Sequence, residues 1–529
     1  MPCPSLSRLV LRLAVSILML LPCAPASSLA QETYSERLPP AVARALKQAG
    51  IPETAVAVVV QEAGATRAQV SLNAGQAFNP ASLMKLLTTY AALDTLGPAY
   101  AWQTEILASR LPVAGVLDGD LVIRGGGDPK LGFEQFWLLL RQLRARGVRE
   151  IRGDLLLDRS LFDAEKIAAA AATPFDDQPL RPYNVTPDAL LVNYKTLRLQ
   201  LLAEQGGKAN QAPDLLVEPR PANLAILNRL RTTNATACGD WKAQLQAEYT
   251  EYIEDAGNGD TGSASPQLIL SGDYPLNCGE QTWHLGAMSH AQYVHGVFRQ
   301  LWQELGGTFS GRLALDKPLP APLYPLARSE SPPLAEIIRD INKYSNNVMA
   351  RQLYLTLGAE WLRRNNLDQD ERLHQTLRPA SAADAARALS AWLAQRQLHF
   401  PELVLENGSG LSRQERLSAN SLAALLQHAW QNPLMPEFIA SLPLAGIDGT
   451  MKKRLQTGSA PGAGQAHIKT GSLDGVSAIA GYIRNRHGQW QIIVFLVNHP
   501  QAATAREAQD VLLRWVYDGD TLSTPRAGH

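Results

Sequence analysis

The sequence predicts an α+β protein whose two ends share one sheet, with the middle of the chain inserted between them. Three observations point to this arrangement. The run 54–61 (TAVAVVVQ) is β-branched and apolar, as in a buried strand. Two more apolar runs, 476–486 and 489–499, meet at His487-Gly488 and predict a hairpin near the other end. Between about 101 and 275, short strand-like pieces alternate with turn-rich stretches.

The other elements follow from periodicity and from turn residues. A strand is expected at 68–72, and a helix begins after Pro80 and ends before Gly97-Pro98. Inside the middle region we expect strands at 119–124, 153–158 and 267–271, a helix at 133–146, and loops at 173–187 and 256–266. Further helical stretches are expected at 287–305, 334–358 and 503–517.

Composition excludes several classes of protein. The chain has 529 residues, enough for roughly three domains. Its 46% apolar and 19% charged residues exclude disordered, collagen-like and coiled-coil chains. Because Lys+Arg and Asp+Glu both number 49, no bulk charge favours nucleic acid or an anionic membrane. Recognition must therefore take place at a specific site.

The first thirty residues are typical of a cleaved export signal. Arg8 and Arg12 flank an apolar run at 13–21 that is too short to span a bilayer. Ser28-Leu29-Ala30 fits the small-residue pattern before a signal-peptidase cut, with a cut after Ala26 as the alternative. A short buried helix is the other interpretation. We expect an exported protein, and no later apolar stretch is long enough for a membrane anchor.

Removal of an export signal would determine which cysteines remain in the mature chain. Cys3 and Cys23 leave with the signal, whereas Cys238 and Cys278 remain and have no CxxC spacing. In an oxidising compartment such a pair predicts a disulfide more simply than a metal or redox site. Two unpaired buried thiols are the alternative. A bond across these 40 positions contributes roughly 3–4 kcal/mol in the chain-entropy model.

The first chemical motif is Ser82-Leu83-Met84-Lys85, at the start of the helix after Pro80. Positions three apart share a helix face, so Lys85 is expected beside Ser82. A serine hydroxyl needs a base, and a lysine can serve only if desolvation or a neighbouring cation lowers its pKa. The helix N-terminus also favours negative charge at Ser82. Taken alone, a capping serine and a surface lysine are the simpler interpretation.

The second motif is Ser345-Asn346-Asn347, between apolar residues. This spacing predicts a short loop or a helix start that projects into a cleft. An ordinary helix cap is the default alternative for such a short match.

The third motif is Lys469-Thr470-Gly471-Ser472, between a strand-like piece and the hairpin, so we expect it on a sheet edge. The lysine supplies a positive charge and the threonine a hydroxyl, while the glycine leaves room for a substrate backbone. An ordinary edge-strand lysine and turn glycine would explain this motif alone. In this order, however, the three motifs are the signature of penicillin-binding proteins and class A β-lactamases.

The chain resembles the class C low-molecular-mass penicillin-binding proteins, the serine D-Ala-D-Ala carboxypeptidase/endopeptidases of the penicillin-binding protein 4 type. The likeness runs from about 40 to 515, is weakest from about 200 to 265, and is also carried by PASLMKLLTTYAAL, GDLVIRGGGDPKL, ENGSGLSR, LPLAGIDGTMKKR and AHIKTGSLDGVSAIAGYI. The 263 positions between Ser82 and Ser345 match a large insertion that β-lactamases lack. Asn346 departs from the aspartate of many relatives, at a position that points away from the reaction in the usual picture.

This resemblance implies a serine β-lactamase/penicillin-binding transpeptidase-like domain, with an antiparallel sheet flanked by helices. The catalytic domain would comprise 31–100 and 280–520. Two nested, non-catalytic domains would lie within 101–279.

The resemblance also implies the catalytic roles. Ser82 attacks the carbonyl between two D-alanines, or between D-alanine and a cross-linking diamino acid. Lys85 accepts the Ser82 proton, and Ser345 helps to pass it to the leaving amine. Water then releases the acyl-enzyme, and no metal or other cofactor is needed.

Binding roles are implied for a second set of residues. Asn347 holds the substrate amide, while Lys469 and Thr470 bind the terminal carboxylate. The backbone N–H groups of Ser82 and Ser472 form the oxyanion hole.

Asp177, in TPFDDQP, is a less specific match. The family has a loop here with an aspartate implicated in holding the free amine of a meso-diaminopimelate side chain, and an acid suits a positive amine. Asp176 is adjacent, so the alignment could slip by one position. A solvated Asp-Asp turn is the alternative.

The implied protein is a periplasmic DD-carboxypeptidase/DD-endopeptidase that acts on peptidoglycan stem peptides and is inhibited by β-lactams. A β-lactamase and a non-catalytic penicillin- or peptidoglycan-binding scaffold are the alternatives. Neither nucleic acid nor an integral membrane anchor is expected. His284, His290 and His295 do not share a helical face at their spacing, so we expect no metal site there.

Overall fold

The computed structural model describes residues 36–172, 175–203, 207–235, 237–253, 264–367, 378–455 and 462–519. The export signal expected at 1–30 and most of the loop expected at 256–266 lie outside the described residues. Among the helices of the described ranges, none has the length and apolar character needed to cross a membrane.

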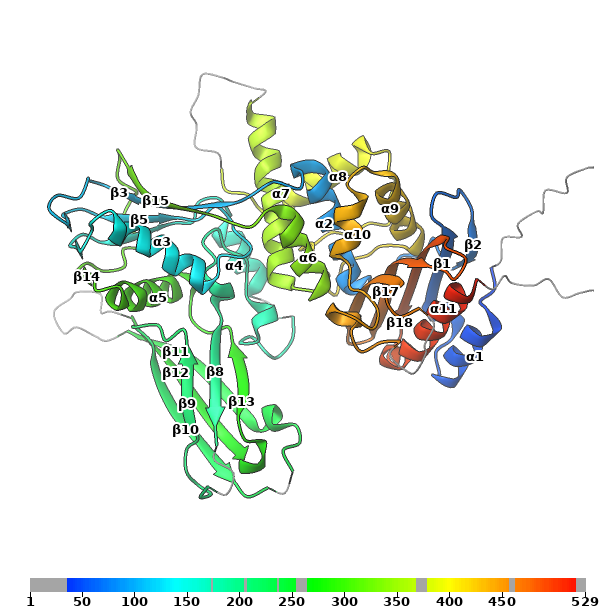
Figure 1. Ribbon diagram of the computed structural model, residues 1–529, viewed down its shortest axis with the longest axis horizontal. Coiled ribbons are helices and arrows are strands. Elements are labelled where there is room, and N and C mark those ends of the chain that lie inside the picture. Colours follow the sequence, from blue (N-terminus) through cyan, green and yellow to red (C-terminus); the bar gives the residue numbers. More distant parts are fainter. Residues whose placement is uncertain are drawn as a thin grey trace, which may run out of the picture. The chain divides into compact units, whose positions relative to one another are not determined.

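A five-stranded antiparallel sheet joins the two ends of the chain (Figure 1). Its strands, in spatial order, are β16 (Ala466–Leu473), β17 (Val476–Arg484), β18 (Trp490–Asn498), β1 (Val56–Glu62) and β2 (Ala68–Leu72). Val56 on β1 lies opposite Val497 on β18, so the expected sharing of one sheet by both ends is confirmed. The hairpin between β17 and β18 is confirmed as well.

Helices cover both faces of this sheet. Val58 and Val60 pack with α1 (Pro40–Gln48) and α11 (Arg506–Asp518). Ala57 and Val59 lie in the other core, with the helix α2 (Met84–Leu96). Because successive side chains of a strand point to opposite faces, a strand covered on both faces needs apolar residues throughout. The unbroken apolar run of β1 is explained in this way.

α2 is the central helix of the larger core. Every residue from Met84 to Leu93 is buried, which is the behaviour of a helix surrounded on all sides. The surrounding helices are α6 (Leu334–Lys343), α7 (Asn347–Leu367), α8 (Ala382–Gln395), α9 (Ala419–Gln431) and α10 (Met435–Ser441). The helix that carries Lys85 is therefore fixed by packing rather than exposed on a surface.

The helical stretch expected at 334–358 consists of two helices, α6 and α7, with a break at 344–346. Ser345 in this break has φ +55°, in the left-handed region. Gly358 does not end α7, which continues to Leu367. A Cβ on Gly358 would lie 2.7 Å from the backbone nitrogen of Ala385, so this glycine permits α7 to pack closely against α8.

The insertion contains two groups of strands, one nested within the other in the sequence. The outer group forms a four-stranded sheet of β15 (Tyr324–Glu330), β3 (Gln103–Ala108), β5 (Leu121–Arg124) and β7 (Leu155–Asp158), and a three-stranded sheet of β14 (Thr308–Phe309), β6 (Glu150–Ile151) and β4 (Val116–Leu117).

The nested group forms two sheets, one of β13 (Gln281–Leu285), β8 (Leu197–Leu202) and β9 (Asp214–Glu218), the other of β10 (Ala225–Thr233), β12 (Ala264–Pro275) and β11 (Leu245–Ile253). One apolar cluster contains side chains of both groups, together with α3 (Phe133–Ala145) and α5 (His290–Glu304).

The chain returns to the part that contains the five-stranded sheet later than expected. β13, α5, β14 and β15 all follow residue 280, yet they share sheets and core with the insertion. The first later element in the core of α2 is α6, which begins at Leu334. The expected boundary at 279–280 is therefore wrong by about fifty residues, because apolar strands and helices do not reveal in the sequence which core they join.

α6 and α7 connect the insertion to the part that contains α2 and the five-stranded sheet. The Gln352 side chain of α7 accepts from the Asp188 N–H (2.8 Å) and donates to the Asp188 carbonyl (2.8 Å). Lys130 of the insertion forms an ion pair with Asp340 of α6 (2.6 Å). Both helices flank the Ser345 break, so the insertion is attached directly beside it.

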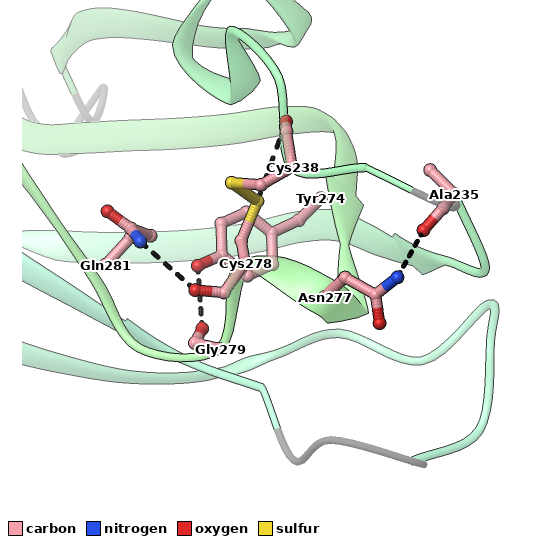
Figure 2. Close-up of a disulfide and its surroundings, with 7 residues drawn as sticks. All are labelled: Ala235, Cys238, Tyr274, Asn277, Cys278, Gly279 and Gln281. Carbon is pink, nitrogen blue, oxygen red and sulfur yellow. Dashed lines mark hydrogen bonds between the residues drawn. A yellow bond between two sulfur atoms is a disulfide. The ribbon is translucent and has the colours of Figure 1, made fainter.

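Cys238 and Cys278 form a disulfide, as expected (Figure 2). It ties the connection after β10 to the short turn Leu276–Cys278 that follows β12. Asn277 adds a hydrogen bond from its side chain to the Ala235 carbonyl (3.0 Å). The bond therefore closes one end of the paired strands β10 and β12.

Replacing both cysteines by serine should lower the free energy of unfolding by roughly 3–4 kcal/mol, since the closed loop spans 40 positions. Hydrogen exchange of β10 and β12 should rise while that of β17 and β18 stays unchanged. Reduced wild-type protein is the matched control and should behave like the variant. Unchanged exchange in β10 and β12 would contradict a stabilising role for the bond.

Candidate active site

Ser82 lies in a tight turn, Ala81–Leu83, that leads directly into α2. The preceding Ala81 has φ +45°, a strained value for a residue with a side chain, and such strain concentrates at functional sites. Asn79 holds the turn: its Oδ1 accepts from the Ala81 N–H (2.9 Å) and its Nδ2 donates to the Ser412 carbonyl (2.8 Å). The Asn79 N–H donates to the Asn498 side chain at the end of β18 (2.7 Å).

Lys85 is the second residue of α2, one turn after Ser82, and has no exposed surface. Its Nζ donates to Ser82 Oγ (3.0 Å), to Asn347 Oδ1 (2.6 Å) and to the Ser409 carbonyl. The amide and carbonyl oxygens can only accept. When the amine is neutral, it keeps two N–H donors and one lone pair, so the lone pair is left for the Ser82 hydroxyl. This geometry suits a base that removes the Ser82 proton.

The electrostatics favour the neutral form of Lys85. Burial lowers the pKa of Lys85 well below its usual value of 10.5, and the nearby Lys469 cation lowers it further. The Glu415 carboxylate acts in the opposite direction, whereas Arg351 lowers this pKa again. Burial is the largest of these effects, so the environment shifts Lys85 toward the neutral form that general-base catalysis requires.

Lys469 lies on β16, the edge strand of the sheet, and is fully buried. Its Nζ donates to Ser345 Oγ (2.9 Å) and to the Thr470 carbonyl (2.7 Å). Burial lowers the pKa of Lys469 to about 7. The structure thus brings together Ser82, Lys85, Asn347, Ser345 and Lys469 through a chain of side-chain hydrogen bonds and the electrostatic proximity of the two lysines.

Gly471 allows β16 to approach the Ser82 turn. A Cβ at this position would lie 2.9 Å from the Pro80 carbonyl oxygen and 3.1 Å from the Ser82 nitrogen. The glycine was expected to leave room for a substrate backbone, but its immediate neighbour is the backbone of the nucleophile turn. Ser472, the next residue, is exposed beside this contact.

Thr470 forms a hydrogen bond with a residue outside the three motifs. Its Oγ1 donates to Thr450 Oγ1 (2.8 Å), in the turn Gly449–Met451. Asp448, just before this turn, forms an ion pair with the buried Lys343 (2.6 Å) at the end of α6. The Lys469-Thr470 strand and the segment that leads to Ser345 are therefore connected through one surface turn.

The loop 406–415 supplies one of the hydrogen-bond acceptors of Lys85, the Ser409 carbonyl. Oε1 of the buried Glu415 accepts from the N–H groups of Glu406 (3.2 Å), Asn407 (3.0 Å) and Gly408 (3.0 Å). Burial raises the pKa of Glu415, although these N–H groups favour its charged form. The loop so fixed places the Ser409 carbonyl against the Lys85 ammonium. Glu415 lies outside the three motifs, and no sequence pattern predicted this role for it.

The two acids at 176–177 behave differently. Asp176 accepts from the Tyr183 hydroxyl (2.7 Å) and from the Asn184 amide (2.7 Å), so its carboxylate is used within its own loop. Asp177 is exposed and makes no hydrogen bond or salt bridge to any other described residue. Phe175 lies beneath the Arg413 guanidinium (5.0 Å), which in turn binds the Asp474 carbonyl just beyond β16 (2.7 Å).

No metal centre is found among the residues that the structure describes, where no three His, Cys, Asp or Glu side chains gather in a suitable cluster.

Replacing Glu415 by alanine should destabilise the protein by about 2–4 kcal/mol, because three N–H groups lose their acceptor, of which that of Gly408 is buried and the other two are partly buried. Glu415→Gln keeps one acceptor oxygen and should lose much less stability. Chemical unfolding measures the difference, and labelling of Ser82 by a fluorescent penicillin reports on the site. Equal stability of the two variants would show that the three N–H bonds do not hold the loop.

Three comparisons place the chain among known proteins. It matches the D-Ala-D-Ala carboxypeptidase 3 (S13) family over residues 38–517. It is 25% identical over 423 residues to D-alanyl-D-alanine carboxypeptidase DacB of Haemophilus influenzae, covering 79% of this chain and 80% of that protein. It is 28% identical over 450 residues to the D-alanyl-D-alanine carboxypeptidase of Actinomadura sp. strain R39, covering 82% and 76% respectively.

The fold is similar to the crystal structure of penicillin-binding protein 4 from Haemophilus influenzae, with a TM-score of 0.70 and 21% identity. That similarity covers 89% of this chain and 99% of the other, and confirms the expected penicillin-binding transpeptidase-like fold. The three motifs and nearly all the described residues fall within the family match. The chain therefore belongs to the D-Ala-D-Ala carboxypeptidase 3 (S13) family of serine peptidases.

Proposed function

We propose that this chain is an exported serine DD-peptidase that cleaves D-Ala-D-Ala termini and D-Ala-diaminopimelate cross-links of peptidoglycan through an acyl-enzyme on Ser82. Family membership supports the reaction class. The observation that supports the residue roles is the buried Lys85, which hydrogen-bonds one hydroxyl group among the described residues, that of Ser82.

Acylation begins when Lys85 removes the Ser82 proton. The Ser82 oxygen attacks the carbonyl carbon, and the C–N bond breaks as the ester forms. The backbone N–H groups of Ser82 and Ser472 hold the developing oxyanion. The close packing of Gly471 on the Ser82 turn supports this role, because it brings the two backbone segments together.

Ser345 and Lys469 act on the leaving group. Lys469 and Thr470 bind its terminal carboxylate, and Ser345 passes the proton to its amine. The bond between Lys469 and Ser345 (2.9 Å) supports a shared task for these two side chains. Water then attacks the ester, which releases the shortened peptide and restores Ser82.

Asn347 and Asp177 bind the part of the substrate that stays on the enzyme. Asn347, already at 2.6 Å from Lys85, holds the substrate amide. Beyond Ser472 the acyl strand runs along β16 toward Asp474, where Arg413 and Phe175 meet. Asp177, two residues after Phe175 and with a free carboxylate, binds the side-chain amine of diaminopimelate there.

The proposed location is the periplasm, after removal of residues 1–30 as a signal peptide. Peptidoglycan stem peptides are the substrates. β-Lactams are the proposed inhibitors, and the solved complex of penicillin-binding protein 4 from Haemophilus influenzae with a β-lactam supports this.

Incubating residues 31–529 with a fluorescent penicillin should give a long-lived adduct on Ser82, located by mass spectrometry, together with release of D-alanine from a pentapeptide. Ser82→Ala should abolish both while the circular dichroism spectrum stays unchanged. An adduct lost within seconds would favour a β-lactamase. Labelling of another serine, or no labelling, would disprove the assignment.

The pH dependence follows from the two lysines. Because Lys85 must be neutral, kcat/KM should fall at low pH as this amine takes up a proton. Because Lys469 must be charged to bind a carboxylate and its pKa is about 7, kcat/KM should also fall as the pH rises above 7. In Lys469→Arg the cation persists, so the alkaline limb should move up and the acid limb should stay. An alkaline limb common to both proteins would contradict this role of Lys469.

A further inference from the structure

An open cleft of about 750 Å³ lies beside the Ser345 segment. One wall is formed by residues 344–348, which include Ser345 and Asn347. The other wall comes from the insertion, through Tyr194 and through side chains of β8, β9 and β13. The cleft is large enough for a ligand of peptide size and reaches the catalytic residues directly.

Three side chains of the insertion form a row in this cleft. Arg198 on β8 lies opposite His284 on β13 and opposite Glu218 on β9. Residues directly opposite one another on neighbouring strands share a face of the sheet, so the three side chains point the same way. All three are exposed and line the cleft, without a hydrogen bond or salt bridge to other described residues. The row thus presents an unpaired cation and an unpaired carboxylate.

A strained turn borders the same cleft. Asn193, Tyr194 and Lys195 have φ of 47°, 52° and 49°, all in the left-handed region. This backbone conformation is strained for residues with side chains, least so for asparagine. The turn is held by bonds from the Asn193 N–H to the Leu131 carbonyl (2.8 Å) and from Lys195 Nζ to the Met288 carbonyl (2.7 Å). Strain that the surroundings enforce is characteristic of binding and catalytic sites.

The turn directs Tyr194 toward the catalytic part. Its hydroxyl contacts the sulfur of Met349 (3.6 Å) in the first turn of α7, which begins at Asn347. On the opposite wall, the side chain of Tyr344 is 69% exposed although it directly precedes Ser345. Two aromatic side chains therefore flank the cleft where it meets the active site.

We propose that this cleft binds the leaving strand of cross-linked peptidoglycan, the second stem peptide that a pentapeptide substrate lacks. The inference rests on the proposed function. Ser345 belongs both to the cleft and to the pair with Lys469 that handles the leaving group. When a pentapeptide is cleaved, a single D-alanine leaves, whereas a cross-link releases a whole peptide that must extend from Ser345 into a neighbouring space.

The chemistry of the cleft matches this ligand. A stem peptide carries carboxylates, which suit Arg198, and a free or linked amine, which suits Glu218. The tyrosine rings offer apolar area with a polar end, as peptide and sugar surfaces require. The path proposed above for the acyl strand runs along β16 toward the bonded pair Arg413 and Asp474, so the cleft remains for the leaving strand.

The test compares two substrates with one variant. Arg198→Gln combined with Glu218→Gln in the mature chain removes both charges of the row from exposed positions. kcat/KM for a D-Ala-diaminopimelate cross-linked muropeptide dimer should fall about five- to tenfold, mainly through KM, since each exposed charge contact is modest. D-alanine release from the monomeric pentapeptide and acylation by penicillin should stay within about twofold of wild type.

The matched control is Arg229→Gln combined with Glu248→Gln. These exposed residues lie on β10 and β11, outside the cleft, and their loss removes the same charges from the same insertion. This control should cleave both substrates at the wild-type rate. An equal loss on both substrates in the cleft variant, or no loss on the dimer, would overturn the proposal.

A binding measurement separates this inference from the proposed function. In the Ser82→Ala background, calorimetry should show tighter binding of the dimer than of the pentapeptide, and the two row substitutions should remove that advantage. If penicillin fails to label wild-type Ser82 but the dimer advantage and its loss persist, the catalytic assignment fails and the cleft assignment stands. Equal binding of dimer and pentapeptide overturns the cleft assignment, whatever the labelling result.

Discussion

A lysine ammonium that is cut off from water must find its hydrogen-bond acceptors within the protein. Lys85 finds them on three segments, at Ser82, Asn347 and Ser409, of which the last two lie 262 and 324 positions away in the sequence. A buried charge with a missing partner is strongly destabilising, so all three segments have to arrive together. The same loss of hydration lowers the pKa of Lys85, which allows the amine to act as a base.

The need to bring the three acceptors of Lys85 together explains much of the surrounding architecture. α2, which carries the lysine, is enclosed on all sides, and the helices that enclose it also cover one face of the five-stranded sheet. β16 then brings a second buried cation, Lys469, to the same place. Because the two amines are buried close together, each raises the free energy of burying the other as a cation. Hydrogen bonds of Lys469 to Ser345 and to the Thr470 carbonyl, and of Lys85 to the Ser409 carbonyl, offset part of this free energy.

Much of this could be predicted from the sequence, because it depends on local patterns. The spacing of Ser82 and Lys85 on a helix, the β17–β18 hairpin and the edge position of Lys469 all follow from short stretches of residues. The S13 family match and the fold agree with the resemblance that the three motifs suggested. The residue roles within that fold remain proposals.

What could not be predicted depends on contacts between distant segments. Glu415 resembles a surface acid between Arg413 and Arg416, and only the folded loop shows that it collects three backbone N–H groups. The one available signal was the Gly/Ser-rich stretch of the loop 406–415, whose backbone N–H groups need hydrogen-bond acceptors once the loop is folded. The row of Arg198, Glu218 and His284 depends on strand register, which no single stretch encodes.

The pairing of β1 with β18 also sets the order in which the molecule can be assembled. Val56 emerges during synthesis more than 400 residues before its partner Val497, whereas every strand of the insertion pairs with another that is complete by Glu330. Such non-local pairing is slow, and separate units of a long chain fold one after another. The insertion can therefore fold while β1 still lacks its partner β18. The Ser82 turn meets the strand that carries Lys469 only after nearly the whole chain is available.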